Sequence, residues 1–596
     1  MGSYRLVRGM SDDISEEALE LVMNYIDDPR DRSVVSQVCR KWYRIDALTR
    51  NHVTVAFCYT INPSDLTRRF KRLESLKLKG KPRASMFNLI QEDWGGYAQP
   101  WIHEISNSSP CLKSLHLRRM IVTDDDLATL VKSHGHMLQA VKLDKCSGFS
   151  TLGLLEIARA CRSLKFFLLE ESSIEDEGGE WLHELALWNS SLEVLNFYLT
   201  GLESIKFNLS DLELLATNCR SLTSLRVNEC DILDLRGVLE KATELEEFGG
   251  GSFSNSDEHA AEVNKDQMIR FPSKLTSLLG LNYMSEAELP AILPRASNLK
   301  KLDLQFTFLS TENHCQLIRL CTNLEVLEVR SVIGDRGLEV VANHCKKLRR
   351  LRVEDGEEEQ GLEDDHNLVS HRGLSAVAQG CPNLEFIAIY VSDISNSALE
   401  TVGEFCKNLR DFRLVLLNKE RVTDLPLDNG VMALLRGCHK LNRFGLYFLR
   451  PGGLTDTGLG YIGKYSTNVR WMLLGFVGES DGGLLEFSKG CSKLERLEMR
   501  GCCFSESALA AAVQNLKSLK YIWVQGYNAT AMGDKLLAMS RPFWNIEFTP
   551  AHQVAMDEFV EDMEGGEQPA QILAYYSLAG RRTDNPKSVI LLSPSM

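Results

Sequence analysis

The sequence lacks the signatures of several enzyme and membrane-protein classes. It has no run of 18 apolar residues, so no segment is long enough to cross a bilayer as a helix. Neither H-E-x-x-H nor G-x-S-x-G occurs, and the 13 histidines are scattered without metal-ligand spacing. The 16 cysteines include no C-x-x-C pair, which argues against a zinc site or a disulfide scaffold.

Positively charged residues are fewer than negatively charged ones. The 596 residues include 67 Lys and Arg against 81 Asp and Glu, a formal net charge of -14. A chain this acidic is a poor general binder of nucleic acid or of an anionic membrane. The first residues, MGSYRLVRGMSDD, contain no apolar core of signal-peptide length, and Leu6 replaces the Ser or Thr of a myristoylation site. We therefore expect an intracellular, soluble and reduced protein with no nucleic-acid or membrane partner.

One repeated sequence pattern extends over most of the chain. The pattern Cys-x-x-Leu-x-x-Leu-x-Leu is clearest from Cys321, Cys345, Cys381, Cys406, Cys438 and Cys491. With weaker copies it begins seventeen times, mostly at intervals of 23 to 30 residues, and amphipathic stretches with helical spacing separate the copies. A strand and a helix at this interval predict an α/β leucine-rich-repeat solenoid of about 17–18 units, a horseshoe or a closed ring. The cysteines fall at helix ends, where a small apolar residue packs inward.

This periodicity also sets the predicted domain boundaries. We expect an N-terminal tail over 1–10, a helical module over 11–55, one solenoid domain over 56–550, and a C-terminal cap and tail over 551–596. Wider intervals follow Phe70, Cys345 and Cys406, and these insertions should emerge from one rim. The second insertion, EDGEEEQGLEDDHN, is most simply a solvated loop.

Strand alternation predicts which side chains line the solenoid's inner face. In each Leu-x-Leu strand the two Leu residues point to the helices, so the residues between them face the hollow. The inner face thus receives Lys77, Lys79, Arg352, Ala388, Tyr390, Arg413, Leu473 and Trp523, with Arg119, Arg350, Tyr447 and Arg500 beside the strands. Curvature would bring these cations together, so they predict a site for an anion; pairing with Asp or Glu of neighbouring strands is the alternative. The aromatic side chains suit a buried small molecule, or are ordinary surface aromatics.

The stretch LKLKGKPRASMFNL, residues 76–89, concentrates these cations. Lys77 and Lys79 alternate with buried leucines, whereas Lys81 has no predicted role and is expected to be solvated. Residues 14–50 form a separate helical module, with one apolar stripe through Leu19, Val22, Met23 and Ile26 and a second through Val34, Val35, Val38, Cys39 and Trp42. The module is either a docking domain or a cap for the solenoid.

Several motifs carry a family resemblance. The segment DPRDRSVVSQVCRKWYRI resembles the second half of an F-box, although Ile14-Ser15 stands where Leu-Pro is frequent. Further segments, among them LDKCSGF, VIGDRGLEV, DFRLVLL, TDLPLDNGV, LEMRGCCFSE, WVQGY and ILAYYSLAG, resemble the coronatine-insensitive family of plant F-box proteins with leucine-rich repeats. The resemblance covers nearly the whole chain.

The resemblance implies a non-catalytic substrate receptor of an SCF-type ubiquitin ligase, nuclear and cytoplasmic but mainly nuclear. Its partners would be a Skp-type adaptor on a cullin scaffold, jasmonoyl-isoleucine, and the degron peptide of a jasmonate ZIM-domain repressor. The resemblance places adaptor contacts at Ile14, Leu19, Val22, Ile26, Val38 and Trp42. It places hormone contacts at Arg83, Ala84, Phe87, Leu89, Arg352, Ala388, Tyr390, Arg413, Tyr447, Leu473, Arg500 and Trp523. An inositol polyphosphate cofactor would bind Lys77, Lys79, Arg119, Arg350, Arg352 and Arg413.

The sequence offers three rival functions, and the first of them, an enzyme with a phosphate-binding loop, is rejected. The segment GLGYIGKY at 458–465 comes near a phosphate-binding loop, but Tyr465 replaces the Ser or Thr that binds magnesium, and the segment falls in a helical half-repeat. A ligand-independent F-box adaptor and an auxin-type receptor would share the architecture. The combination of Arg83, Arg352, Arg413 and Tyr390 favours jasmonate over a planar aromatic acid.

Overall fold

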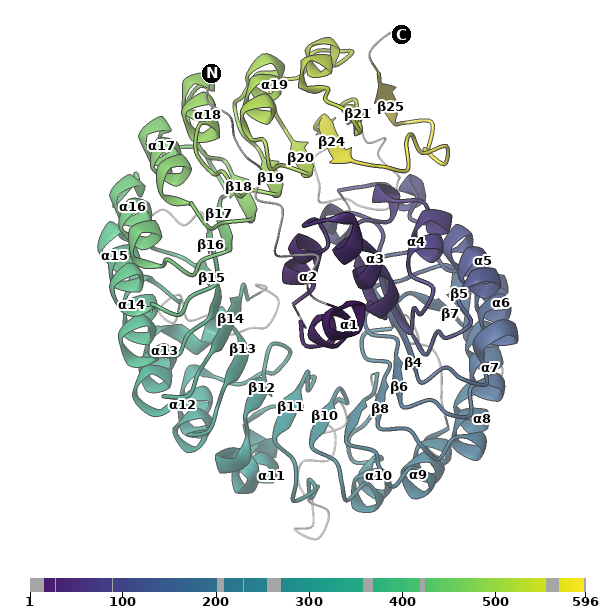
Figure 1. Ribbon diagram of the computed structural model, residues 1–596. Helices are drawn as coiled ribbons and strands as arrows, with labels where there is room; N and C mark the ends of the chain where they lie inside the picture. The colour runs from purple at the N-terminus through teal and green to yellow at the C-terminus, as the bar shows by residue number, and fades with distance from the viewer. Residues whose placement is uncertain are drawn as a thin grey trace. The chain divides into compact units, whose positions relative to one another are not determined.

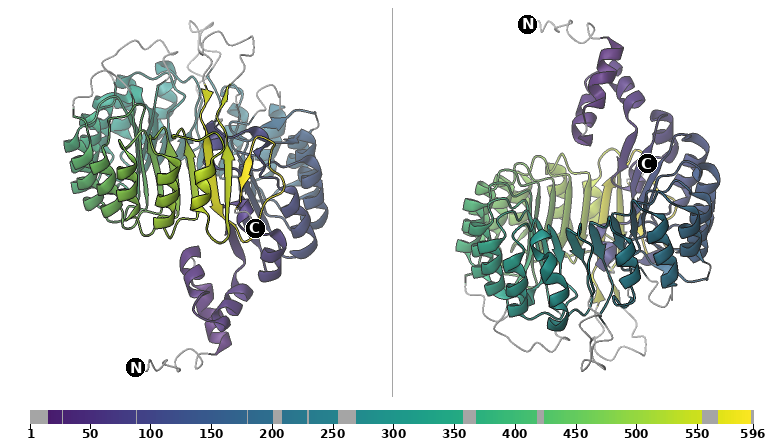
Figure 2. Two further views of the ribbon diagram at one scale, coloured as in Figure 1. Left: turned by 90° about the horizontal axis from the view of Figure 1, so that it is seen from above. Right: turned by 90° about the horizontal axis from the view of Figure 1, so that it is seen from below.

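The computed structural model describes residues 15–26, 28–87, 89–178, 180–200, 208–228, 230–253, 269–356, 368–417, 424–553 and 567–593. The chain divides into two units, residues 1–224 and 225–596, and strand–helix repeats occur in both. In each unit the strands form an inner layer and the helices an outer layer (Figures 1 and 2).

The first unit begins with three helices, α1 (Glu16–Asn24), α2 (Pro29–Val35) and α3 (Arg40–Thr49). Its strands are β1 (His52–Val55), β2 (Ser75–Lys79), β3 (Ser114–Arg118), β4 (Ala140–Asp144), β5 (Phe149–Ser150), β6 (Phe166–Leu168), β7 (Ile174–Glu175) and β8 (Val194–Asn196). The helices of its repeats are α4 (Pro63–Arg69), α5 (Gln99–Ser108), α6 (Asp124–His134), α7 (Thr151–Ala160), α8 (Trp181–Trp188) and α9 (Leu209–Asn218). Strands β1, β2, β3, β4, β6 and β8 pair in parallel in that order, and β5 pairs with β7.

The second unit continues the same alternation. After β9 (Ser224–Arg226), at the boundary, come β10 (Glu247–Gly249), β11 (Ser277–Leu279), β12 (Lys301–Asp303), β13 (Val326–Arg330), β14 (Arg350–Glu354), β15 (Phe386–Val391), β16 (Asp411–Leu416), β17 (Arg443–Phe448), β18 (Trp471–Gly475), β19 (Arg496–Arg500) and β20 (Tyr521–Gln525). The helices are α10 (Arg236–Lys241), α11 (Leu289–Ile292), α12 (Thr311–Leu320), α13 (Gly334–His344), α14 (His371–Gly380), α15 (Asn396–Phe405), α16 (Asp428–Gly437), α17 (Asp456–Tyr465), α18 (Asp481–Ser488) and α19 (Glu506–Asn515). Strands β10 to β20 pair in parallel, each with the next.

The predicted repeat is confirmed strand by strand. Every one of the seventeen predicted starts is followed by a parallel strand, from β2 to β20. In β14 the alternation is plain, since Leu351 and Val353 are buried while Arg350 and Arg352 are only half-buried. The cysteines also lie as predicted: Cys345 and Cys381, for example, follow the last residues of α13 and α14 and are fully buried. Burial raises the pKa of the Cys381 thiol to about 11, so these thiols are packing groups.

Consecutive helices of the second unit are tied together by a recurring contact, here called the interrepeat clasp. An acidic residue in the first turn of one helix accepts hydrogen bonds from a Ser or Thr at, or a few residues before, the start of the next. Asp428 accepts from the Thr455 backbone N–H at 3.0 Å and from its hydroxyl at 2.5 Å. The clasps run without a break from α16 to η10 (Asp534–Met539) through the pairs Asp428–Thr455, Asp456–Ser480, Asp481–Ser505 and Glu506–Thr530.

The clasp explains why glycine occupies the third position after both Thr455 and Ser480. A Cβ atom at Gly458 would lie 2.2 Å from Oδ1 of Asp428, and one at Gly483 would lie 2.1 Å from Oδ1 of Asp456. No side chain fits beside the carboxylate, so glycine is required by the close approach of neighbouring repeats.

The C-terminal segment extends the sheet of the second unit beyond β20. Strand β24 (Gln571–Tyr576) pairs antiparallel with β20 on one side and with β21 (Trp544–Thr549) on the other. Strand β25 (Ile590–Leu592) then pairs with β21. Short strands β22 (His552–Gln553) and β23 (Glu567–Gln568) pair separately. Residues assigned to the predicted cap therefore lie against the last repeats.

The N-terminal helices α1 to α3 form a small module with its own core. Leu19, Met23 and Ile45 are buried, and Ile26, Val35 and Trp42 pack against them. The second predicted apolar stripe is divided between two helices, because α2 ends at Val35 and α3 begins at Arg40.

A buried carboxylate links this module to the first repeat. Asp46 is fully buried and accepts from Arg32 at 3.0 Å, from Arg50 at 2.9 Å and from Arg69 of α4 at 3.1 Å. Arg69 also lies over the Tyr43 ring at 4.0 Å. Three cations around one carboxylate fix α3 against both its neighbours.

Candidate functional site

The predicted inner-face residues of the second unit lie on neighbouring strands, as alternation requires. The residues that occupy one row, side by side in the register, are Glu328, Arg352, Ala388, Arg413, Gly445, Leu473, Glu498 and Trp523. A second row, one step along, contains Arg330, Glu354, Tyr390, Val415, Tyr447, Gly475, Arg500 and Gln525. The two rows of the unit thus contain arginine and aromatic side chains, interspersed with carboxylates and small or aliphatic residues.

Arg350 and Arg352 already have carboxylate partners on the neighbouring strand. Arg350 Nε donates to Glu328 at 3.1 Å, and Arg352 pairs with Glu354 and, at 3.8 Å, with Glu328. Burial opposes the charge on Arg352, but Glu354 and Glu328 outweigh it and raise the pKa of the guanidinium. Burial also raises the pKa of the nearby Asp303 carboxyl to about 6. Pairing between strands, the alternative to an anion site, is therefore what the structure shows for these two arginines.

Arg413 is paired as well, and among the described residues its ion pair occupies one edge of the guanidinium. Its Nε and Nη2 donate to Asp411 at 2.9 and 2.7 Å. The guanidinium lies 5.4 Å from the Phe386 ring centre and 5.1 Å from that of Trp471. A guanidinium has five N–H donors in a planar fork, so Asp411 and the two rings orient Arg413 without using all its donors.

The aromatic residues lie where the sequence predicts. Tyr390 and Tyr447 are half-buried on β15 and β17. Arg500 lies 5.8 Å from the centre of the Tyr447 ring. Burial raises the pKa of the Tyr447 hydroxyl, and Arg500 partly offsets this effect, so Tyr447 stays a neutral donor. Ala388, between Arg352 and Arg413 in the register, leaves space in the wall.

Trp523 lies deeper than the other predicted contacts. It is 4% exposed, it pairs with Leu573 of β24, and its indole N–H donates to Gln571 at 3.2 Å. Residues far along the chain thus cover much of its ring. The sequence did not single out Trp471 and Glu498 of the same sheet as site residues. For Trp471, an aromatic residue at the start of a predicted strand was the available signal.

The first unit carries a separate basic row. Lys77, His116 and Lys142 lie side by side on β2, β3 and β4. Burial and the nearby Arg118 lower the pKa of Lys77, and burial lowers the pKa of His116 despite its contact with Asp144 at 3.7 Å. Asp144 is shared with Arg118 at 3.0 Å, so cations outnumber carboxylates here. The sequence predicted Lys77 and Lys79 for this surface but missed His116.

The segment after β2 forms η2 (Arg83–Phe87). Arg83 lies 5.8 Å from the Phe87 ring, Phe87 is exposed, Ala84 is buried and Leu89 is half-buried. Arg119 follows β3 and its Nε donates to the Lys81 carbonyl at 2.9 Å. Whether the first-unit residues and the second-unit arginines meet one ligand remains a prediction.

The expectation that Lys81 is solvated is wrong. Its side chain is 8% exposed, and its ammonium donates to the Glu92 carbonyl. Burial lowers the pKa of Lys81. The amine instead anchors the segment that carries Arg83.

The N-terminal module offers a large apolar surface. Of the predicted adaptor contacts, Val22 and Val38 are exposed, Ile26 and Trp42 are half-buried, Leu19 is in the core, and Ile14 lies outside the described residues. The exposed set also includes Val34 of the second predicted stripe and four residues that the sequence missed: Leu21, Tyr25, Tyr43 and Leu48. So many exposed apolar side chains on so small a module mark a protein-binding surface.

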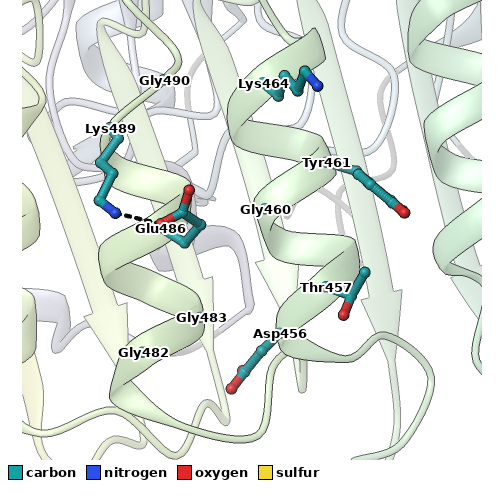
Figure 3. A pocket seen from close by; sticks show the side chains of 10 residues that line it. All are labelled: Asp456, Thr457, Gly460, Tyr461, Lys464, Gly482, Gly483, Glu486, Lys489 and Gly490. Carbon is teal, nitrogen blue, oxygen red and sulfur yellow. Dashed lines mark hydrogen bonds and ion pairs between the residues drawn. The ribbon is translucent and has the colours of Figure 1, made fainter.

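The outer face of the second unit has a groove of about 600 Å³ between α17 and α18 (Figure 3). Gly460, Tyr461 and Lys464 line it, and the segment that resembles a phosphate loop is helical throughout, as expected. Lys489 on the opposite wall pairs with Glu486. The groove therefore belongs to helix packing on the outer layer.

The part of the chain described above lacks two further features. No cluster of His, Cys, Asp and Glu there is arranged to hold a metal ion, and no helix there is long and apolar enough to span a membrane. The acidic insertion predicted after β14 falls mostly at 357–367, outside the described residues.

Comparison with known families agrees with this architecture. An F-box matches residues 11–52, and a Transport inhibitor response 1 protein domain matches residues 71–117. The F-box match covers the module α1 to α3, and the strand–helix repeats follow it. The molecule is an F-box protein with a leucine-rich-repeat solenoid, the class of substrate adaptors of SCF-type ubiquitin ligases.

Curated relatives narrow the class further. Coronatine-insensitive protein homolog 1b of Oryza sativa subsp. japonica is 59% identical over 597 residues, 99% of this chain and 98% of the relative. Coronatine-insensitive protein 1 of Arabidopsis thaliana is 58% identical over 578 residues, 97% and 96% of the two chains. GRR1-like protein 1 of Arabidopsis thaliana is 34% identical, with 96% of each chain covered. The chain belongs to the coronatine-insensitive family of F-box proteins, which places it in jasmonate signalling.

Proposed function

We propose that this protein is a receptor for jasmonoyl-isoleucine that recruits the degron of a jasmonate ZIM-domain repressor for ubiquitination. The observation that carries the proposal is Arg413, held between Asp411, Phe386 and Trp471 with part of its donor fork unused. A planar, oriented guanidinium is suited to a carboxylate ligand. Tyr390 and Tyr447 on the two adjacent strands, and Arg352 one strand further, supply further donors.

The proposal needs no catalysis by this chain. Hormone bound beside Arg413 would present new surface to the repressor, so hormone and degron would raise each other's affinity. The F-box would meanwhile hold a Skp-type adaptor and, through it, a cullin scaffold. The repressor lysines then experience a high effective concentration of the ubiquitin-charged enzyme. Because the targets are transcriptional repressors, the proposed site of action is mainly the nucleus, with a cytoplasmic pool.

The decisive experiment measures binding of a labelled degron peptide to the full chain in complex with its adaptor. We expect binding only when jasmonoyl-isoleucine is present, and a loss of about tenfold or more for Arg413→Ala, since a charge-assisted hydrogen bond is worth about 1.5–3 kcal/mol. Arg410→Ala is the matched control, because Arg410 is exposed and contacts Glu385 only at 4.0 Å. Both variants should hold the adaptor normally.

A ligand-independent F-box adaptor is the second candidate, because Arg350, Arg352 and Arg413 all have carboxylate partners of their own. It predicts equal degron binding with and without hormone, in which case the receptor proposal fails. An auxin-type receptor would instead show degron binding that responds to a planar aromatic acid.

We also propose that an inositol polyphosphate binds the basic row of the first unit. Lys77, His116 and Lys142 lie together half-buried, and burial, with the nearby Arg118, lowers the pKa of Lys77. Lys79 and Arg119 lie beside the row, and the resemblance adds Arg350, Arg352 and Arg413 of the second unit. The polyanion would supply the missing negative charge and hold the inner strands in place.

This proposal predicts a pH dependence with a definite sign. Because burial lowers the pKa of His116, its imidazole is neutral at neutral pH, and a polyanion favours the protonated form. Binding should therefore take up a proton, and affinity for inositol hexakisphosphate should rise as the pH falls toward the lowered pKa of the free imidazole. Calorimetric titration at several pH values, corrected for protonation of the phosphate groups themselves, should show this rise in affinity for the wild type and not for His116→Gln. A parallel pH profile in both proteins would exclude His116.

A further inference from the structure

The inner face of the second unit contains a buried carboxylate that the proposed hormone contacts do not use. Glu498 of β19 is 8% exposed and lies in the same row as Arg413, with Leu473 and Trp523 as its register partners. Both of those neighbours are apolar. A carboxylate in such surroundings is expensive to bury unless it receives hydrogen bonds.

The Trp471 indole supplies one of those hydrogen bonds. Its Nε1–H donates to Oε1 of Glu498 at 2.9 Å, across two adjacent strands. Trp471 is itself buried. A hydrogen bond at the indole nitrogen, together with packing around the ring, fixes the plane in which the indole lies.

That plane matters because cations lie on the Trp471 ring. The guanidinium of Arg443 is 4.7 Å from the ring centre and that of Arg413 is 5.1 Å. Both arginines also contact Asp411, at 3.4 and 2.7 Å. Cation–π attraction depends on the cation lying over the face of the ring, so rotation of the indole would remove this support.

We propose that Glu498 is a positioning residue for Arg413. By holding the Trp471 indole it fixes the surface against which the Arg413 guanidinium lies, and so sets the direction of the donors that Asp411 leaves unused. Glu498 itself does not touch the anion. This inference rests on the proposed function, in which Arg413 binds the hormone carboxylate.

The test is a double-mutant cycle on the full chain with its adaptor. Glu498→Gln keeps an acceptor for the indole N–H, whereas Glu498→Leu keeps the bulk and removes the acceptor. We expect Glu498→Leu to weaken hormone-dependent degron binding by about fivefold or more, because it leaves the indole donor buried without a partner, and Glu498→Gln to restore most of it. In an Arg413→Lys background, where the planar stack is already lost, Glu498→Leu should have no further effect.

Two outcomes would overturn the inference. One is an unchanged degron affinity in Glu498→Leu. The other is an equal loss in both backgrounds, which would show that Glu498 supports the fold generally and not Arg413. Adaptor binding and the thermal midpoint of each variant are measured alongside, because a general fold defect would lower both.

A readout without hormone separates this inference from the proposed function. The indole N–H resonance of Trp471, assigned by its loss in Trp471→Phe, reports the ring contact directly. Arg413→Ala should shift this resonance in the wild-type chain but not in Glu498→Leu. If degron binding proves independent of hormone, the proposed function fails, and this comparison still decides whether Glu498 positions Trp471 against Arg413.

Discussion

The substitution Asp46→Ala should unfold the F-box helices and abolish adaptor binding. The Asp46 side chain is fully buried, and it pairs with Arg32, Arg50 and Arg69. Arg32 is buried too, so removing the carboxylate leaves an uncompensated charge in the interior. Breaking a buried ion pair in this way costs about 3–5 kcal/mol, which exceeds what a module of three short helices can lose.

The experiment uses the full chain, with adaptor affinity and hydrogen exchange in α1 to α3 as measurements. Asp65→Ala is the matched control, because Asp65 pairs with Arg68 on the surface of α4 and should contribute less than about 1 kcal/mol. We expect rapid exchange and lost adaptor binding for Asp46→Ala only, with the repeats beyond α4 unaffected. Adaptor affinity within twofold of wild type would show that the carboxylate does not hold the module together.

The second large effect is expected from two glycines one turn apart in α17. A Cβ atom at Gly463 would lie 2.6 Å from the Phe487 carbonyl oxygen and 2.9 Å from its Cα, whereas one at Gly460 would meet only Glu486 Cγ, at 3.5 Å. Gly463→Ala should therefore force α17 and α18 apart, at a cost of about 1–3 kcal/mol. Gly460→Ala should instead stabilise by up to about 1 kcal/mol through helix propensity.

Chemical denaturation of the two variants measures this difference, and the opposite signs are the informative result. Because both residues lie in one helix, propensity alone predicts the same change for both. Equal stabilisation by the two substitutions would mean that the helices of adjacent repeats are not held at the described separation.

Much of this architecture could be predicted from the sequence, because the repeat is periodic and each repeat meets the same environment. Alternation in the strands placed Arg352, Ala388 and Arg413 on the inner face, and the position after each helix explained the buried cysteines such as Cys381. These are local rules, and a local rule repeated many times is read reliably from one chain.

The parts that could not be predicted depend on contacts between distant segments. Trp523 is covered by β24, which lies about fifty residues further along, and nothing in its own repeat indicates this. The Glu498–Trp471 hydrogen bond requires both the strand register and the two side-chain conformations. Lys81 follows strand β2, in which Lys77 and Lys79 are half-buried. Its ammonium nevertheless donates to the carbonyl of Glu92 and is buried. In α1, a stripe of apolar residues did not separate the buried Leu19 from the exposed Val22.

The unbroken series of clasps from α16 to η10 has a consequence for how this stretch comes apart. Each helix start is held by the helix before it and holds the one after it. A single repeat in the middle cannot fray alone, since doing so breaks the carboxylate contacts on both its sides. Local melting should therefore begin at the margins of the series and travel inward, so that this block loses order cooperatively.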